Sequence, residues 1–173
     1  MTSPASLARL LRQSISNEDE VVPLAREVEY AKGYLTIQKM RYKDKLEFEI
    51  DVEPSILNIP LIKLVLQPII ENAIYHGLKY KESKGLLQVK GFMKDGNAVL
   101  QVIDNGVGMD EETLSHIYDK HKVNYHSNGV GVYNVQKRLK LYYGENYGIT
   151  YESEKGVGTT ATITIPGIQE ESI

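Results

Sequence analysis

The segment LLQVKGFMKDGNAVLQVIDNGVGM (86–109) decides the fold, because it predicts two strands followed by a glycine-rich turn. Apolar side chains dominate residues 86–93 and 98–103, which is typical of neighbouring buried strands. Asp95-Gly96-Asn97 lies between them and favours a tight hairpin turn, because Asp, Asn and Gly tolerate the positive φ angles of such turns. The sequence therefore predicts an antiparallel hairpin whose second strand ends in Asp104 and two glycines.

Further strands and helices are predicted on both sides of this hairpin. Strands are expected where apolar and polar residues alternate, at LEFEIDV (46–52) and at about 149–154 and 159–165. Helical spacing of apolar residues predicts helices in five places, namely 3–16, from Pro23, from Pro60 to His76 with an interruption at Pro68, from Asp110 through Tyr118, and 130–143. This order predicts an α+β fold, a two-layer α/β sandwich with helices on one face of a mixed, mainly antiparallel sheet.

Composition narrows the class of protein. The 173 residues are 42% hydrophobic and 25% charged, which suits one globular domain. A net charge of −3 gives no basic surface for nucleic acid, and the absence of cysteine excludes disulfides and thiolate metal sites. No run approaches the roughly 20 apolar residues that a membrane span needs. We therefore expect a soluble, cytoplasmic domain that does not bind nucleic acid.

Three short motifs carry residues suited to nucleotide chemistry. Asp104-Asn105-Gly106-Val107-Gly108 follows a strand, so backbone without side chains can approach a flat ligand while Asp104 accepts a hydrogen bond from an exocyclic amine. An ordinary glycine-rich turn explains this motif equally well. Glu71-Asn72 interrupts an apolar helix, and an amide oxygen is a hard ligand suited to Mg²⁺. On its own, this pair is better explained as a helix end that faces solvent.

The third motif is Asn128-Gly129-Val130-Gly131, which comes immediately before a predicted helix. Free N–H groups and the positive end of the helix dipole at such a start favour phosphate. The polar residues 119–128 in front of it predict a mobile loop. Lys137, Arg138 and Lys140 are expected on the exposed face of the helix, although Arg138 could instead assist phosphate binding. A single Gly-x-Gly before a helix is common, so this motif is weak alone.

Taken together, the motifs resemble the GHKL ATPase family, whose fold is called the Bergerat fold. Asn72 on a helix, the Asp104 turn, the Gly129-x-Gly131 segment and Gly156-x-Gly158-Thr159 correspond in order and approximate spacing to its N, G1, G2 and G3 boxes. Longer stretches, including LAREVEYAKGYLTIQKMRYKDKLEFEIDV (24–52) and IPLIKLVLQPIIENAIYHG (59–77), are similar to sensor histidine kinases of the LytS/YesM type. With these added, the resemblance covers nearly the whole chain.

The resemblance implies ATP and Mg²⁺ as cofactors and assigns a role to each matching residue. Asn72 would bind Mg²⁺ that bridges the ATP phosphates, and Glu71 would be the nearby polar or basic group. Asp104 would hold the adenine amine, with Thr159 assisting through water. Loop 119–128 would be the ATP lid. Backbone at the remaining positions would approach the base or the phosphates, and these positions are Gly106, Gly108, Gly129, Gly131 and, one turn further on, Asn134.

One position departs from the family pattern. Many members carry a basic residue three positions after the metal-binding Asn, where this chain has Tyr75. His76 or Lys79 could supply the contact with phosphate instead. His76 could also pack beside the nucleotide, and a helix-end histidine facing water explains this residue equally well. Three further histidines are five residues apart, namely His116, His121 and His126. This is the wrong spacing for one helical face, and it favours a solvated lid over a metal site.

The resemblance also implies what lies outside the chain. None of the four histidines falls on a predicted dimerisation helix, so the phosphoacceptor histidine is expected upstream, in a homodimeric, membrane-associated parent protein. Residues 1–43 would be the end of its dimerisation and phosphoacceptor region, 44–168 the ATP-binding domain and 169–173 a tail. The activity would be transfer of the ATP γ-phosphoryl group to histidine and onward to a response-regulator receiver domain. The alternatives are an anti-sigma-type serine kinase and a degenerate nucleotide-binding interaction module.

Overall fold

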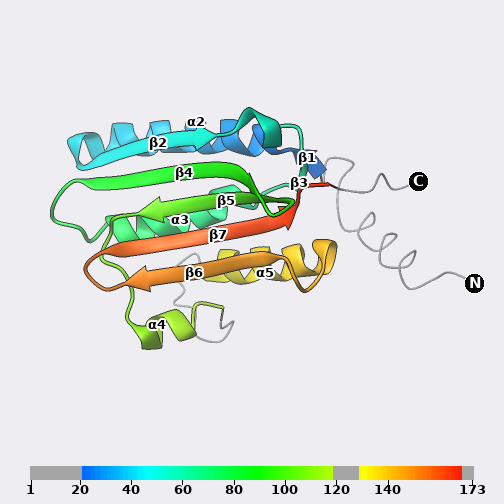
Figure 1. The fold of residues 1–173 in the computed structure, drawn as a ribbon. Helices are drawn as coiled ribbons and strands as arrows, with labels where there is room; N and C mark the ends of the chain where they lie inside the picture. Colours follow the sequence, from blue (N-terminus) through cyan, green and yellow to red (C-terminus); the bar gives the residue numbers. More distant parts are fainter. Residues whose placement is uncertain (1–20, 119–128, 169–173) are drawn as a thin grey trace, which may run out of the picture.

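A five-stranded sheet forms the centre of the molecule (Figure 1). The computed structural model describes residues 21–118 and 129–168. The strand order is β2-β4-β5-β7-β6, with β2 at Leu46–Val52, β4 at Gly85–Lys94, β5 at Asn97–Asp104, β7 at Gly158–Pro166 and β6 at Gly148–Glu154. β2 pairs with β4 in parallel and every other pair is antiparallel, which confirms the predicted mixed sheet.

The predicted hairpin between β4 and β5 is confirmed. Asp95 and Gly96 form its two-residue turn with φ angles of 51° and 79°, as a type I′ turn requires. The register runs from Lys94 opposite Asn97 at the turn to Leu87 opposite Asp104 at the open end. Because side chains alternate along a strand, Asp104 points to the same face as the buried Leu100 and Val102.

Helices cover one face of this sheet (Figure 1). They are α2 at Leu24–Tyr42, α3 at Leu66–Asn72, which continues as the π-helical segment η3 at Ala73–Leu78, and α5 at Gly129–Tyr143. Short 3₁₀ turns lie at Lys43–Lys45 (η1) and Pro54–Ile56 (η2), and α4 at Glu111–Ser115 follows the Asp104 turn. This arrangement confirms the α+β two-layer sandwich.

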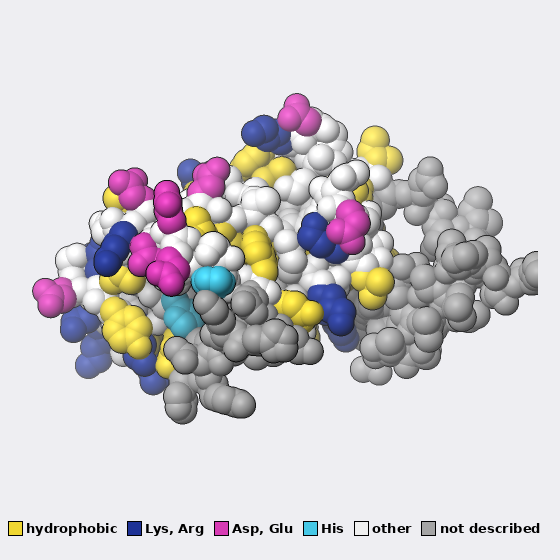
Figure 2. All heavy atoms as spheres, turned by 90° about the horizontal axis from the view of Figure 1, so that it is seen from below, with side chains coloured by type: hydrophobic (Ala, Val, Ile, Leu, Met, Phe, Trp, Pro, Cys, Tyr) yellow, Lys and Arg dark blue, Asp and Glu magenta, His cyan; other side chains and the backbone are white. Residues whose placement is uncertain are grey.

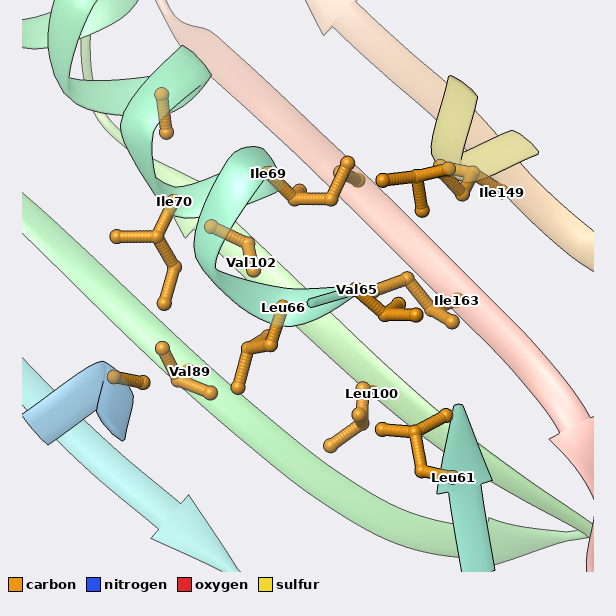
Figure 3. Close-up of a cluster of buried hydrophobic side chains, with 14 of the residues drawn as sticks. Leu61, Val65, Leu66, Ile69, Ile70, Val89, Leu100, Val102, Ile149 and Ile163 are labelled. Atoms are coloured by element: carbon orange, nitrogen blue, oxygen red, sulfur yellow. The ribbon is translucent and has the colours of Figure 1, made fainter. Parts of the chain in front are cut away.

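The core lies between α3 and the sheet. Figure 3 shows Val65, Leu66, Ile69 and Ile70 pointing toward side chains from β4, β5 and β7, and all four are at most 1% exposed. Burial of one such side chain stabilises the fold by about 1.5–3 kcal/mol. On α5 the predicted inward residues Val132, Val135 and Leu139 are buried too. These contacts fix α3, and with it the polar end of that helix.

The helix predicted from Pro60 to His76 is wrong at its start. Pro60–Ile62 forms the short strand β3, which pairs antiparallel with β1 at Val21–Pro23, and the helix begins only at Leu66. Pro68 lies in the first turn, where a missing backbone N–H removes no helical hydrogen bond, so it marks a new helix rather than a kink. The helix predicted from Asp110 is also shorter than expected and ends at Ser115.

Helix α2 shares the core with the sheet layer. Its Leu24, Ala31 and Leu35 are buried in the same cluster as α3 and the strands. The division of the chain between residues 43 and 44 stays a prediction. The first predicted helix, the lid segment 119–128 and the tail 169–173 lie outside the described residues. Within the described part, no helix combines the length and apolarity that a bilayer crossing requires.

Candidate functional site

The Asp104 carboxyl is the most deeply buried acidic group at the open end of the β4–β5 hairpin. It is 6% exposed, and it accepts a hydrogen bond from the backbone N–H of Gly106 at 2.9 Å. Burial raises the pKa of this carboxyl to about 6, against the lowering effect of the Gly106 and Thr159 backbone N–H groups and of Lys81. A buried carboxyl with so few donors is suited to accept a hydrogen bond from a ligand amine.

Glycines let three backbone segments meet around Asp104. A Cβ atom at Gly77 would lie 2.7 Å from Asp104 Oδ1, and one at Gly106 would collide with the carbonyl of Gly77. The backbone N–H of Val107 donates to that same carbonyl at 3.0 Å. Gly108 has a φ of 68°, and a Cβ there would collide with the carbonyl of Glu154. Side chains at Gly106 and Gly108 are therefore excluded by the protein's own backbone.

Asn72 and Glu71, which are adjacent at the end of α3, have different neighbours. Asn72 is half-buried, and it lowers the pKa of the Tyr151 phenol on β6. Asp104 raises the pKa of the same phenol. Glu71 accepts a hydrogen bond from Gln67 Nε2 at 3.0 Å. Burial of Tyr34 on α2 is the largest cause that raises the pKa of that phenol, and the charge of Glu71 is the second. Asn72 and Asp104 thus both influence the Tyr151 phenol, whereas Glu71 influences Tyr34 on α2 and accepts a hydrogen bond within its own helix.

Tyr151 is a site residue that the motifs did not indicate. Burial is the largest cause that raises the pKa of its phenol, and the charges of Tyr118 and Asp104 raise it further. Asn72 lowers it. Asn72 lies close enough to influence this hydroxyl, yet within the described residues the hydroxyl has no hydrogen-bond partner of ordinary geometry. A buried polar atom without a partner costs free energy, so a ligand atom or water is its expected partner. A tyrosine at an inward position of a strand was the only signal.

The other groups near Tyr151 already have partners. Tyr118, whose pKa burial raises to about 12, donates to the Ile149 carbonyl at 2.7 Å, and its ring meets that of Tyr151 edge to face. Thr159 shares a hydrogen bond of 2.7 Å with Ser153, whose hydroxyl accepts from Met109 N–H at 2.8 Å. Thr159 therefore contributes a backbone N–H to Asp104, and its hydroxyl is tied to β6.

Lys79 lies beside Tyr75, the residue at the position where the family pattern has a basic side chain. Its Nζ lies 4.5 Å from the centre of the Tyr75 ring, a cation–π distance, and the Tyr75 and His76 rings meet edge to face at 5.1 Å. Burial lowers the pKa of His76 below its usual value of 6.5, so this imidazole is mainly neutral at pH 7. Of these two residues, Lys79 is the cation.

The remaining predicted site residues lie on α5, which begins at Gly129. A Cβ at Gly131 would lie 3.4 Å from the side chain of Pro68, so α5 packs closely on the start of α3. Asn134 is exposed one turn further on. Arg138, expected on the exposed face, instead donates hydrogen bonds to the Lys63 and Leu64 carbonyls.

Acidic side chains gather on the side that carries α4 and the β6 edge (Figure 2). The exposed ones on those two elements and at the α4 cap are Asp110, Glu111, Glu112, Glu152 and Glu154. Asp110 caps α4 as predicted, because its carboxylate accepts from Thr113 N–H at 2.8 Å. In the described ranges no three His, Asp or Glu side chains converge on one point, so a metal ion would need oxygen atoms from a ligand or water.

A hollow of about 460 Å³ also lies beside the end of β5, on the other face of the sheet. Gln88, Ile103, Thr160 and Glu152 line it and form one cross-strand row. Their side chains alternate with the buried ones, so they point away from the helices. Asp104, Ser153 and Thr159 also line this hollow, so it reaches the end of the sheet at which the Asp104 carboxyl faces Gly77.

Two family models match the chain. Residues 58–169 match the family described as histidine kinase-, DNA gyrase B- and HSP90-like ATPase, and residues 3–46 match the family described as histidine kinase. Sensor histidine kinase YesM of Bacillus subtilis (strain 168) is 33% identical over 161 residues, which are 93% of this chain and 26% of the relative. Sensor protein LytS of Oceanobacillus iheyensis is 34% identical over 143 residues, 81% of this chain and 24% of the relative.

The chain thus spans about a quarter of the length of these curated relatives. Among solved structures, the mycobacterial sensor histidine kinase MprB is similar with a TM-score of 0.63 and 19% identity, over 85% of this chain and 96% of that one. The catalytic domain of histidine kinase ThkA, in a nucleotide-free form, has a TM-score of 0.63 and 14% identity, over 85% of this chain and 94% of that one. At these identities the likeness shows the fold.

Proposed function

The chain belongs to the histidine kinase-, DNA gyrase B- and HSP90-like ATPase family, and on that premise we propose that it is the catalytic domain of a sensor histidine kinase. ATP binding follows from family membership. We propose that ATP binds between η3, the end of β5 and the start of α5, and that its γ-phosphoryl group passes to a histidine outside this chain. The observation that carries this proposal is the buried Asp104 carboxyl, enclosed by glycine backbone, beside Asn72 and Tyr151.

Asp104 holds the adenine end of the nucleotide in this proposal. Its ionised carboxyl accepts a hydrogen bond from the exocyclic amine of adenine, which compensates for the loss of water around the carboxyl. Thr159 assists through its backbone N–H, which also lowers the pKa of Asp104. Gly106 and Gly108 keep the loop backbone close to the base, and the absent side chain at Gly77 leaves Asp104 open to the helical layer.

The phosphate end lies toward Asn72 and Lys79. Asn72 supplies an amide oxygen for Mg²⁺, and the ATP phosphates and water would complete its coordination, as this ion requires. Bound magnesium would neutralise charge on the phosphates. Lys79 replaces the basic residue that Tyr75 displaces, and the Tyr75 ring holds its ammonium group in place. Gly129 and Gly131 offer backbone N–H groups at the start of α5, with Asn134 one turn further on.

The acceptor and the partners lie outside this chain. The attacking imidazole would come from a phosphoacceptor helix of the parent protein, which we propose is a membrane-associated homodimer, and the phosphoryl group would then pass to a response-regulator receiver domain. Glu71 would orient or deprotonate the attacking group when the acceptor docks, although here it is bound to Gln67. The match of residues 3–46 to the histidine kinase family favours histidine over serine as the acceptor.

Transfer of label from ATP tests this proposal. The chain is incubated with γ-³²P-ATP, magnesium and the purified histidine-bearing region of the Bacillus subtilis relative YesM, beside the Asn72→Ala and Asp104→Asn variants. We expect acid-labile, base-stable label on that region with the wild type and none with either variant. Label that survives acid would indicate a serine kinase. Binding of nucleotide without any transfer would contradict the transferase proposal and favour the interaction module.

A further inference from the structure

A buried acidic side chain accepts backbone hydrogen bonds at the turn Lys63–Val65, which connects β3 to α3. Glu27 of α2 is only 3% exposed, and its carboxylate accepts hydrogen bonds from the backbone N–H of Leu64 at 2.5 Å and of Leu66 at 3.2 Å. Leu64 has a φ of 61°, in the left-handed region that non-glycine residues seldom adopt. The turn therefore depends on outside contacts to keep its shape.

A second charged side chain holds the same turn from α5. The Arg138 guanidinium donates to the Lys63 carbonyl at 2.7 Å and to the Leu64 carbonyl at 3.3 Å. Backbone N–H groups of the turn thus face an anion, and its carbonyl groups face a cation. Through Glu27 and Arg138, three helices (α2, α3 and α5) meet at one short segment of backbone.

The start of α3 explains why an acid occupies position 27. The first N–H groups of a helix have no partner within the helix, and Val65, at the cap position, contributes no side-chain hydrogen bond. Glu27 supplies this cap from another helix, and its negative charge suits the positive end of the helix dipole. Burying a carboxylate is costly without such partners, so packing alone would favour an apolar residue here.

We propose that Glu27, assisted by Arg138, is a positioning residue for the magnesium end of the nucleotide site. Asn72 is the last residue of α3, about 9 Å along the helix axis from Leu66. Apolar contacts hold α3 against the sheet and Glu27 holds the start of its first turn, so a change at this start would shift Asn72 along or around the helix axis. Asp104 lies on β5 and is fixed by pairing with β4 and β7, so the adenine end does not depend on Glu27. This inference rests on the proposed function of Asn72.

Magnesium dependence of nucleotide binding tests this role. Glu27→Gln keeps the size of the side chain but turns an N–H donor toward the turn's own N–H groups, and Glu29→Gln makes the same charge change at an exposed position of α2. We expect Glu27→Gln to weaken ATP affinity about tenfold with magnesium and less than about twofold in EDTA, because hydrogen bonds to charged groups are strong. Glu29→Gln should match the wild type in both. Equal losses with and without magnesium, or no loss, would overturn the proposal.

Hydrogen exchange of the nucleotide-free protein gives a readout that does not require binding. Glu27→Gln should speed amide exchange over residues 64–72 and leave β5 and β7 unchanged. Arg138→Gln, with Lys137→Gln as its exposed control, should do the same more weakly, and it serves if Glu27→Gln does not fold. Unchanged exchange over 64–72 would refute the positioning role. If wild-type binding lacks magnesium dependence, the proposed function fails instead, and exchange still decides whether Glu27 holds α3.

Discussion

Replacing Asp104 by asparagine should stabilise the folded chain at neutral pH while abolishing its contact with adenine. Burial is the main cause that raises the pKa of this carboxyl from 3.8 to about 6 in the folded protein. The folded state therefore disfavours the ionised carboxylate relative to the unfolded chain. Asparagine has nearly the same shape and can still accept the hydrogen bond from Gly106 N–H, but it carries no charge.

The magnitude follows from the two pKa values. Each pKa unit corresponds to about 1.4 kcal/mol, so ionised Asp104 costs the folded state about 3 kcal/mol at full ionisation. Below pH 3.8 the carboxyl is protonated in both states and the cost is absent. The cost grows between pH 3.8 and about 6 and is fully present above that. The unpaired amide of the variant offsets part of the gain, so we expect about 1–3 kcal/mol at pH 7.5.

Urea unfolding at pH 4.5, 6 and 7.5 measures this effect. The stability of Asp104→Asn relative to the wild type should rise with pH and level off near neutrality. Asp51→Asn removes the same charge from an exposed position on β2 and controls for net charge. A constant difference between Asp104→Asn and the wild type across this range, or a variant less stable than the wild type at pH 7.5, would refute the reasoning.

Three further substitutions test separate parts of the site. Tyr151→Phe should raise the free energy of unfolding by about 1 kcal/mol, because it removes a buried hydroxyl that has no ordinary partner in the described structure. The same change should weaken Mg·ATP binding several-fold. A lower thermal stability of Tyr151→Phe than of the wild type would mean that the hydroxyl already has a hydrogen-bond partner. Gly106→Ala should lower the free energy of unfolding by about 2 kcal/mol or more, because the new Cβ would collide with Gly77. In the same urea titration, Gly33→Ala on α2 should raise it by about 0.5–1 kcal/mol, because a Cβ there meets no atom within 4 Å. Lys79→Ala should weaken ATP binding in calorimetry about threefold or more while leaving adenosine binding unchanged, and an equal loss for both ligands would exclude a phosphate role.

Local chemistry explains which parts of the fold could be predicted from sequence. The β4–β5 hairpin needs only alternating apolar residues and a turn that accepts positive φ at Asp95 and Gly96. The α4 cap at Asp110 is local too, since its partner is Thr113. Strand β3 was missed because Pro60–Ile62 and Leu66–Ile70 form one nearly continuous apolar run, and only pairing with β1 makes the first part extended.

The parts of the site that escaped prediction depend on contacts between distant segments. Glu27 has the ordinary sequence pattern of an exposed helical residue, and its burial follows from a turn 37 residues away. The positive φ of Leu64 has no sequence signal, because leucine does not favour it. Asp104 and Asn72 were predicted from motifs, yet Tyr151 beside them emerges only when β6 is placed next to β7.

Calorimetric titration with Mg·ATP tests the central claim, that Asp104 and Asn72 form one magnesium-dependent ATP site, most directly. The wild type, Asp104→Asn, Asn72→Ala and the exposed control Asn58→Ala are titrated with ATP in magnesium and again in EDTA. We predict saturable binding that Asp104→Asn abolishes, that loses its magnesium dependence in Asn72→Ala, and that Asn58→Ala leaves unchanged. A folded wild type that does not bind ATP, or Asp104→Asn binding as tightly as the wild type, would contradict the account.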